Sequence, residues 1–159
     1  MDFHIVKPVA LEKAVEILKG GILWLDLKDR GLADYLIKDE YRRVLASYSS
    51  NLVFSTKYHI ETTKLKKAYP EAVVLLSLQC APAKVLSLIE EAGADGISLE
   101  IAYATEELVK EVKTGGYLIA VWTVNDEDSA IRASLLGVDY IVSDYVEMVR
   151  RVCEGMTVK

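Results

Sequence analysis

Cysteine, histidine and proline are scarce in this sequence, and their scarcity limits the chemistry that the chain can carry. Its 159 residues include two cysteines, two histidines and three prolines. Cys80 and Cys153 are too far apart for a Cys-x-x-Cys redox or zinc motif. Each lies in an apolar stretch, so we expect both to be buried, unreactive thiols in a reducing cytoplasm.

Long apolar runs and clusters of basic residues are also missing. No apolar run approaches the roughly 20 residues that a membrane-spanning helix requires. The segment Met1–His4 lacks the basic and apolar regions of a secretory signal. The net charge is −5, and no window is rich in lysine and arginine. We therefore expect a cytoplasmic protein with no membrane span and no nucleic-acid partner.

What the sequence does contain is a regular alternation of short apolar runs and amphipathic helical patterns. Valine, isoleucine and leucine occupy successive positions in the runs, which is typical of strands buried on both faces of a parallel sheet. The runs start about every 20 to 30 residues, which is the size of one βα unit. The expected strands are Ile22–Leu27, Leu52–Ser55, Val73–Leu78, Gly96–Ile101, Leu118–Val124 and Tyr140–Val142.

The segments between these runs carry signals for the start and end of helices. Thr105 can cap a helix over Glu106–Val112, and Asp126 or Asp128 can cap the next one. Gly93 stands where glycine commonly ends a helix. Further helices are expected over Leu11–Leu18, from Pro82 to Gly93, around Ile131 and Leu135 before Gly137, and over Val146–Val152.

Six βα units in line predict an α/β fold, either an open doubly wound sheet or part of a closed parallel (β/α) barrel of the TIM type. A complete barrel usually takes about 250 residues and eight strands, so we expect an incomplete or reduced barrel of about six to seven units. It would form one domain over residues 1–159, with Phe3–Val6 as the seventh strand. Unpaired strands at the edges of such a sheet promote association, which predicts a homo-oligomer.

Polar residues at the carboxyl ends of the strands are the candidates for a site, because ligands of parallel α/β proteins bind there. Asp26 and Lys28 lie on one face at the end of the first clear run. They can hold a divalent cation and a phosphate oxygen, or they can form a structural ion pair. Glu100 lies amid apolar neighbours and needs a partner. If it faces inward with Asp26, the two carboxylates predict a site for Mg²⁺ or Ca²⁺.

Other strand ends supply candidates for ligand contacts. Ser55 can donate a hydrogen bond, Trp122 offers an apolar wall for a small polyol, and Asn125 ends the same run. Each has a structural alternative, as a loop residue or as part of the core. His59 could act as a general base. However, it precedes a solvated helical segment, Glu61–Lys67, so a surface histidine is the simpler interpretation.

Two adjacent motifs near the carboxyl end resemble the closing signature of the glycerophosphodiester phosphodiesterases. The last two strands of that family read much like V-W-T-V-N and G-V-D-G-I-x-T-D. Here residues 121–125 read V-W-T-V-N and residues 137–144 read G-V-D-Y-I-V-S-D. Residues 25–28, L-D-L-K, are similar to the family's I-E-I-K, with Asp26 in place of a metal-binding glutamate. Order and spacing agree over roughly residues 11–150.

This resemblance implies a TIM barrel that hydrolyses glycerophosphodiesters with two histidines and a Ca²⁺ or Mg²⁺ ion. It makes Asp26 a metal ligand, Lys28 a phosphate contact and the candidate catalytic residue, and Trp122 a wall of the glycerol pocket. The family's opening motifs, His-Arg, Glu-x-Asp and His-Asp, have no counterpart in the 25 residues before Asp26. Acid–base catalysis needs groups within hydrogen-bond reach. We therefore expect absent or altered catalysis and the binding of a phosphorylated, glycerol-type ligand.

Three alternatives stay open. The chain could be an active, metal-dependent phosphoric diester hydrolase that uses Asp26, Lys28 and Glu100 or residues of a partner chain. It could also be a non-catalytic oligomeric scaffold. Finally, Asp26-x-Lys28 is similar to the Asp-x-Lys-x-x-Asp motif of orotidine-phosphate-decarboxylase-like barrels. Gly31 stands where that motif has its second aspartate, so we favour the first family.

Overall fold

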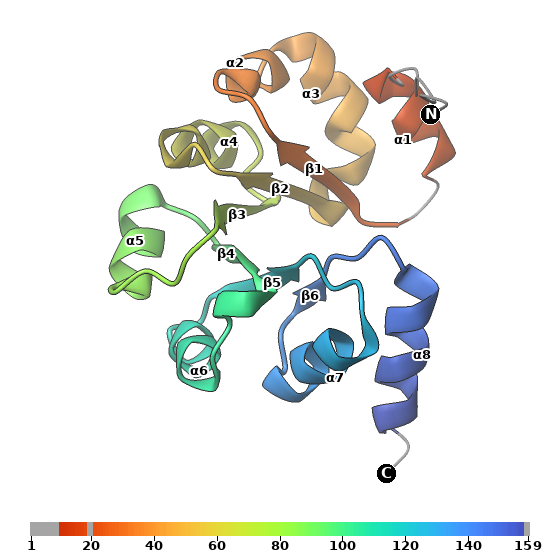
Figure 1. Ribbon diagram of the computed structural model, residues 1–159. Coiled ribbons are helices and arrows are strands. Elements are labelled where there is room, and N and C mark those ends of the chain that lie inside the picture. The colour runs from red at the N-terminus through yellow and green to blue at the C-terminus, as the bar shows by residue number, and fades with distance from the viewer. Residues whose placement is uncertain (1–9, 19–20, 158–159) are drawn as a thin grey trace, which may run out of the picture.

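The chain folds into a curled layer of six parallel strands with helices on its outer side (Figure 1). The computed structural model describes residues 10–18 and 21–157, and the predicted strand Phe3–Val6 lies outside these ranges. The strands are hydrogen-bonded in chain order, each parallel to the next. They are β1 (Leu23–Leu27), β2 (Leu52–Thr56), β3 (Val73–Leu78), β4 (Gly96–Glu100), β5 (Leu118–Trp122) and β6 (Tyr140–Ile141).

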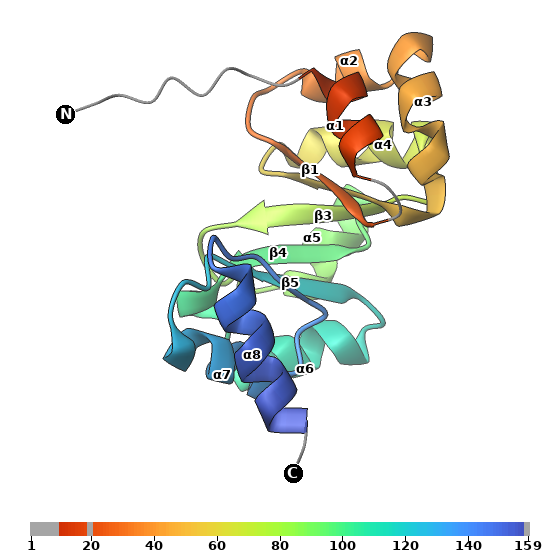
Figure 2. The same cartoon turned by 90° about the vertical axis from the view of Figure 1, so that its right-hand side faces the viewer.

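Helices connect successive strands and cover the convex side of the sheet (Figure 1 and Figure 2). Buried apolar side chains fill the space between the two layers. None of the helices in the described ranges is long and apolar enough to cross a membrane. The α-helices are α1 (Leu11–Ile17), α2 (Leu32–Leu36), α3 (Asp39–Leu45), α4 (Thr62–Ala68), α5 (Val85–Ala92), α6 (Glu106–Thr114), α7 (Glu127–Leu136) and α8 (Val146–Thr157), and the short 3-10 helices are η1 (Ala46–Asn51), η2 (His59–Glu61) and η3 (Ile101–Tyr103).

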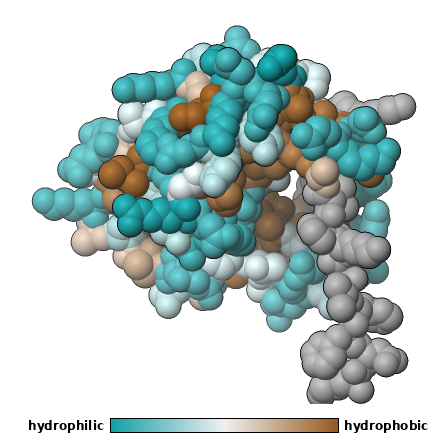
Figure 3. Space-filling view, turned by 90° about the horizontal axis from the view of Figure 1, so that it is seen from above, coloured by the Kyte–Doolittle hydropathy of each residue, from teal (hydrophilic) through white to brown (hydrophobic). Residues whose placement is uncertain are grey.

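This arrangement is a half-barrel, so the predicted fold class, an incomplete parallel barrel of the TIM type, is confirmed. The runs of apolar residues predicted these strands correctly: all five residues of β2, four of the six in β3 and four of the five in β4 are buried, as expected for strands covered on both faces. On the face shown in Figure 3, hydrophilic residues cover most of the surface and hydrophobic residues show between them.

Local sequence signals account for the starts of two helices. The Thr105 side chain accepts a hydrogen bond from the backbone N–H of Leu108 at 3.2 Å, which confirms it as the cap of α6. Asp126 accepts one from the backbone N–H of Ser129 at 2.8 Å. Asp126 and not Asp128 is therefore the residue that caps α7.

Other helix boundaries show where the sequence signals are strong and where they fail. Gly93 and Gly137 end α5 and α7 with φ values of 62° and 67°, a region that side chains with a Cβ rarely adopt. By contrast, α5 begins at Val85 and not at Pro82. The short helices α2 and α3 carry none of the start and stop signals that predicted the others.

Apolar side chains also fill the inner side of the curl. Val53, Leu75 and Ala120 are buried there, next to Trp24 and Tyr140. The rings of Trp24 in β1 and Tyr140 in β6 meet edge to face, with centroids 5.4 Å apart and planes at 88°. Within the part of the chain that the structure describes, β1 and β6 are the sheet edges and share no backbone pairing. The two rings therefore bridge the open side of the half-barrel.

Two aspartates that directly precede strands fasten the sheet to its helices. Asp95, before β4, accepts a hydrogen bond from the backbone N–H of Val74 at 2.8 Å and pairs with Lys66 of α4 at 2.9 Å. Asp139, before β6, repeats this arrangement with a backbone N–H of β5 at 2.9 Å and with Lys113 of α6 at 3.0 Å. Asp139 therefore has a structural role in joining β5 to α6.

The two thiols differ from expectation in one respect. Neither cysteine forms a disulfide bond in the structure. Cys153 is partly buried, but Cys80 is exposed, so the prediction of burial is wrong for it. The physical reason is that Cys80 lies in the loop between β3, which ends at Leu78, and α5, which begins at Val85.

We predict that Asp95→Ala lowers the free energy of unfolding by about 1–3 kcal/mol, because the buried backbone N–H of Val74 loses its acceptor. Glu91→Ala, on the exposed side of α5, should change this free energy by less than about 0.5 kcal/mol. Urea denaturation followed by circular dichroism measures both variants against the parent. Equal stability of the two variants would show that the aspartate contributes nothing.

Candidate functional site

A cavity of about 410 Å³ opens at the carboxyl ends of the strands. This is the end at which parallel barrels bind their ligands. Two tryptophans, two lysines, two aspartates and several hydroxyl and amide side chains surround it. The lining residues are Trp24, Asp26, Leu27, Lys28, Ser55, Lys57, Ser77, Gln79, Ser98, Trp122, Thr123, Val142 and Asp144.

A chain of hydrogen bonds runs from the inner core to the mouth of this cavity. The Trp24 indole N–H donates to the Ser55 hydroxyl at 2.8 Å, and that hydroxyl donates to Asp26 Oδ1 at 2.9 Å. The other carboxylate oxygen of Asp26 pairs with the Lys28 ammonium. Asp26 and Ser55 are register partners on β1 and β2. The sheet itself thus fixes the carboxylate that holds Lys28 at the cavity mouth.

Ser55 lines the cavity, and its predicted contact with a ligand stays a prediction. Its side chain is 2% exposed, and its hydroxyl both accepts and donates a hydrogen bond within the protein. The role of Ser55 in this structure is to position Asp26. The side chains of Ser77 and Gln79, at the end of the neighbouring strand β3 and in the loop after it, line the same cavity.

Lys57 is a cavity residue that the sequence patterns did not single out. It directly follows β2, and its ammonium lies 5.4 Å from the centre of the Tyr58 ring. Unlike Lys28, it forms no ion pair with any carboxylate in the described ranges. Its position at a strand end is the signal that could have identified it. The cavity therefore has one neutralised lysine and one lysine free to meet an anion.

The predicted metal pair does not come together as expected. Asp26 lines the cavity, whereas Glu100 at the end of β4 is not among the lining residues. β2 and β3 lie between their two strands. Across residues 10–18 and 21–157, no group of three or more histidine, cysteine, aspartate or glutamate side chains is placed to hold a metal ion. The described residues thus do not by themselves fit a Mg²⁺ or Ca²⁺ ion, and that cofactor stays a prediction.

Trp122 is held at the cavity wall. Its indole N–H donates to the backbone carbonyl of Ser98 on β4 at 3.0 Å, and the peptide bond between Trp122 and Thr123 is cis. The β4 and β5 strands pair in register at this point. The ring therefore presents an apolar surface to the cavity, and its predicted role as a wall for a small polyol stays a prediction.

Asn125 lies outside the cavity and joins two loops. Its amide nitrogen donates to Asp144 Oδ2 at 2.8 Å. Its amide oxygen accepts from the backbone N–H of Asp144 at 3.0 Å and from the Ser143 hydroxyl at 3.3 Å. Both ends of the amide are thus used within the protein. This contact fixes Asp144, which does line the cavity.

The segment around His59 is less solvated than predicted. His59 is half-buried on η2 and does not line the cavity, and burial lowers the pKa of its imidazole. Glu61 is only 2% exposed, so its assignment to a solvated segment is wrong. The Glu61 carboxylate accepts hydrogen bonds from the backbone N–H groups of Gly31 and Ala33 at the start of α2. These hydrogen bonds explain why Glu61 can be buried. His4 lies outside the described residues.

A sequence model of the glycerophosphoryl diester phosphodiesterase family matches residues 27–148, well over half of the chain. The matched region contains Lys28, Lys57 and Trp122, and it ends after the last strand. No curated protein matches the chain.

Solved structures with the same fold are similar at low sequence identity. A phosphodiesterase from Oleispira antarctica, solved with the product sn-glycerol-3-phosphate, is 22% identical with a TM-score of 0.76, over 91% of this chain and 60% of that one. A glycerophosphodiester phosphodiesterase from Parabacteroides distasonis is 18% identical with a TM-score of 0.73, over 92% and 63%.

A third structure, from Agrobacterium tumefaciens and assigned by its name to the glycerophosphoryl diester phosphodiesterases, is 16% identical. Its TM-score is 0.81, over 96% of this chain and 66% of that one. At these identities the likeness establishes the fold. The chain spans 60–66% of the length of these three proteins.

We predict that Ser55→Ala lowers the free energy of unfolding by about 1–3 kcal/mol, because the Trp24 indole loses its acceptor and Asp26 loses a donor. The matched control is Ser77→Ala, a serine on the same cavity whose hydroxyl makes no hydrogen bond within the described structure. Its effect should stay within about 0.5 kcal/mol. Urea denaturation followed by tryptophan fluorescence compares them. A control as destabilised as Ser55→Ala would contradict the prediction.

His59 should make the protein less stable in mild acid. Because its pKa is below the ordinary value of 6.5 in the folded state, the unfolded chain binds the proton more tightly. Unfolding free energy therefore falls as the pH drops through the range below about 6.5. Between about pH 7.5 and 5.5, the parent should lose more stability than His59→Asn. Parallel pH profiles of the two proteins would refute this.

Proposed function

The chain belongs to the glycerophosphoryl diester phosphodiesterase family, and we propose that the mouth of its half-barrel binds a small phosphorylated ligand of the glycerol phosphate type, with absent or altered catalysis. The observation that carries this proposal is the convergence of Lys28, Lys57 and Trp122 on one cavity at the carboxyl ends of the strands. An ammonium pair supplies attraction for a phosphate, and the indole supplies an apolar wall.

The cavity suits a ligand of this size and polarity. Its volume of about 410 Å³ lies at the small end of the range for ligand pockets. Ser77 and Gln79 can exchange hydrogen bonds with glycerol hydroxyls while Lys57 meets the phosphate. Lys28, paired with Asp26, lines the same cavity. Binding needs only these groups and no proton transfer.

Catalysis requires more than the described residues place at this cavity. General acid–base chemistry needs a proton-transfer group within hydrogen-bond reach of the substrate, and His59 is not among the lining residues. In the proposal, Lys28 therefore binds the phosphate by charge attraction, and the catalytic role predicted for it stays a prediction. We also propose that the protein is cytoplasmic, in keeping with two cysteines that form no disulfide.

A second candidate function is an active, metal-dependent phosphoric diester hydrolase. Membership of a phosphodiesterase family favours it. In that case Asp26, Lys28 and Glu100, or residues from a partner chain, would complete the catalytic group. A third candidate, a scaffold without a ligand, predicts that nothing binds at the cavity.

We predict that sn-glycerol 3-phosphate binds and that glycerol alone does not, because the lysines recognise the phosphate. Lys28→Met and Lys57→Met should each weaken binding by at least about fivefold, whereas Lys67→Met, an exposed lysine on α4, should not change it. Isothermal titration calorimetry measures all four proteins. The absence of heat at millimolar ligand would leave only the scaffold.

Fluorescence and turnover separate the remaining possibilities. Both tryptophans of the chain line the cavity, so ligand binding should change the emission of the parent protein, and Trp122→Phe should remove most of that change. Hydrolysis of glycerophosphodiesters is assayed with Mg²⁺ or Ca²⁺. Turnover that is lost in both Asp26→Ala and Lys28→Ala would replace the binding proposal with the active hydrolase.

A further inference from the structure

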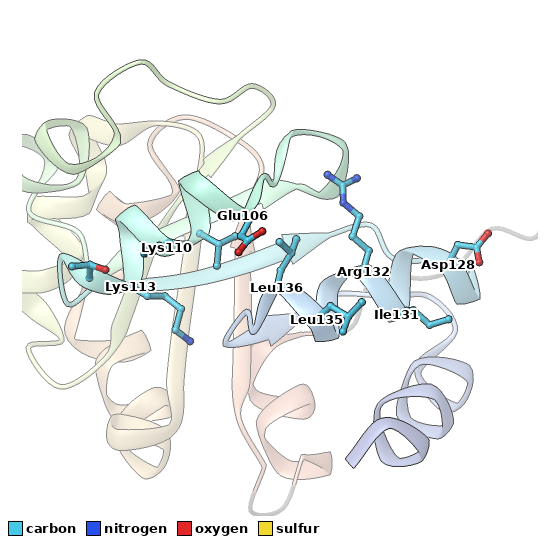
Figure 4. A pocket seen from close by; sticks show the side chains of 10 residues that line it. Glu106, Lys110, Lys113, Asp128, Ile131, Arg132, Leu135 and Leu136 are labelled. Atoms are coloured by element: carbon cyan, nitrogen blue, oxygen red, sulfur yellow. The ribbon is translucent and has the colours of Figure 1, made fainter. Parts of the chain in front are cut away.

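The cavity at the strand ends differs from the larger groove on the outer side of the molecule in how its charges are placed. That groove, of about 780 Å³, lies between α6 and α7 (Figure 4). Its α6 wall carries both Glu106 and Lys110. Its α7 wall carries both Asp128 and Arg132. Because each wall mixes the two signs, neither side of the groove favours an ion of one sign.

Four charged side chains line the cavity at the strand ends, and two of them neutralise each other. The four are Asp26, Lys28, Lys57 and Asp144. Asp26 in β1 and Lys28 directly after it form an ion pair. Neither Lys57 nor Asp144 forms an ion pair with another residue of the described ranges. The cavity thus keeps one unpaired positive charge and one unpaired negative charge.

These two unpaired charges come from different parts of the cavity wall. Lys57 directly follows β2, near the edge of the sheet that begins with β1. Asp144 lies in the loop between β6, the last strand, and α8. The strands β3, β4 and β5 lie between β2 and β6 in the sheet order. A ligand in the cavity therefore meets a positive charge from one part of the sheet and a negative charge from another.

Asp144 is held in place and has one carboxylate oxygen to offer to a ligand. Asn125 donates to its Oδ2 at 2.8 Å and accepts from its backbone N–H at 3.0 Å. Its Oδ1 has no hydrogen-bond partner among the described residues. Trp122 lines the same part of the cavity, because β5 and β6 pair side by side. A carboxylate and an indole on one side of a cavity suit an ammonium group.

Building on the proposed function, we infer that Asp144 selects a ligand that carries an amino group as well as its phosphate. Lys57 meets the phosphate, and Asp144 together with Trp122 meets the protonated amine. A neutral polyol phosphate would leave the Asp144 carboxylate with no cation to offset its repulsion of the phosphate. The preferred class of ligand is therefore the phosphate ester of an amino alcohol.

The test compares two ligands that differ in a single group. sn-Glycerol 3-phosphate has a 2-hydroxyl, and 2-amino-3-hydroxypropyl phosphate has an ammonium in its place. Isothermal titration calorimetry of the full chain at low ionic strength should give a dissociation constant about three- to tenfold lower for the amine. Equal constants would overturn this inference and leave the proposed function intact. If neither ligand bound at millimolar concentration, both would fail.

Two variants separate selection by Asp144 from a general effect of charge or of folding. Asp144→Asn keeps an oxygen for the Asn125 amide and removes the charge, so the two ligands should then bind about equally well. Glu147→Gln removes the same charge from the first turn of α8, outside the cavity, and should keep the preference of the parent. Circular dichroism checks that both variants are folded. If Asp144 only held its loop in place, Asp144→Asn would weaken both ligands alike and leave the preference unchanged, which would overturn the inference.

Discussion

The edge-to-face contact between Trp24 and Tyr140 joins the two edge strands of the curled sheet. These residues lie on the first and last strands, which share no backbone hydrogen bonds in the described ranges. Buried apolar residues from β2, β3 and β5 pack around the two rings. The rings contact each other across the inner side of the curl, and the cavity at the carboxyl ends of the strands, which Trp24 also lines, opens beside them.

The same tryptophan connects this core to the candidate site. Its ring contributes to the closure, while its N–H begins the hydrogen bonds that run through Ser55 to Asp26 and then to Lys28. At the opposite end of the sheet, Asp95 and Asp139 tie strands to helices. The amino-terminal end of the sheet is thus devoted to stability, and the carboxyl end holds the side chains that can meet a ligand.

The fold was largely predictable because its signals are local. Successive buried positions identify the strands, and Thr105 and Asp126 cap the helices that the sequence assigned to them. Partners that are distant in sequence were not predictable. Asn125 could be recognised as a strand-end residue, but only the folded chain brings it to Asp144. Glu61 sits among lysines in the sequence, and its burial follows from backbone groups some 30 residues earlier, at Gly31 and Ala33.

The two lysines of the cavity differ in whether a carboxylate already pairs with them. Lys28 is already paired with Asp26, so an anion must share that ammonium with a carboxylate that Ser55 holds in place. Lys57 has no such partner in the described ranges and keeps its full charge for the ligand. Coulombic attraction is weakened where an opposite charge lies nearby. Under the proposed function, Lys57 therefore supplies most of the attraction for phosphate, and Lys28, which the sequence motif singled out, chiefly orients it.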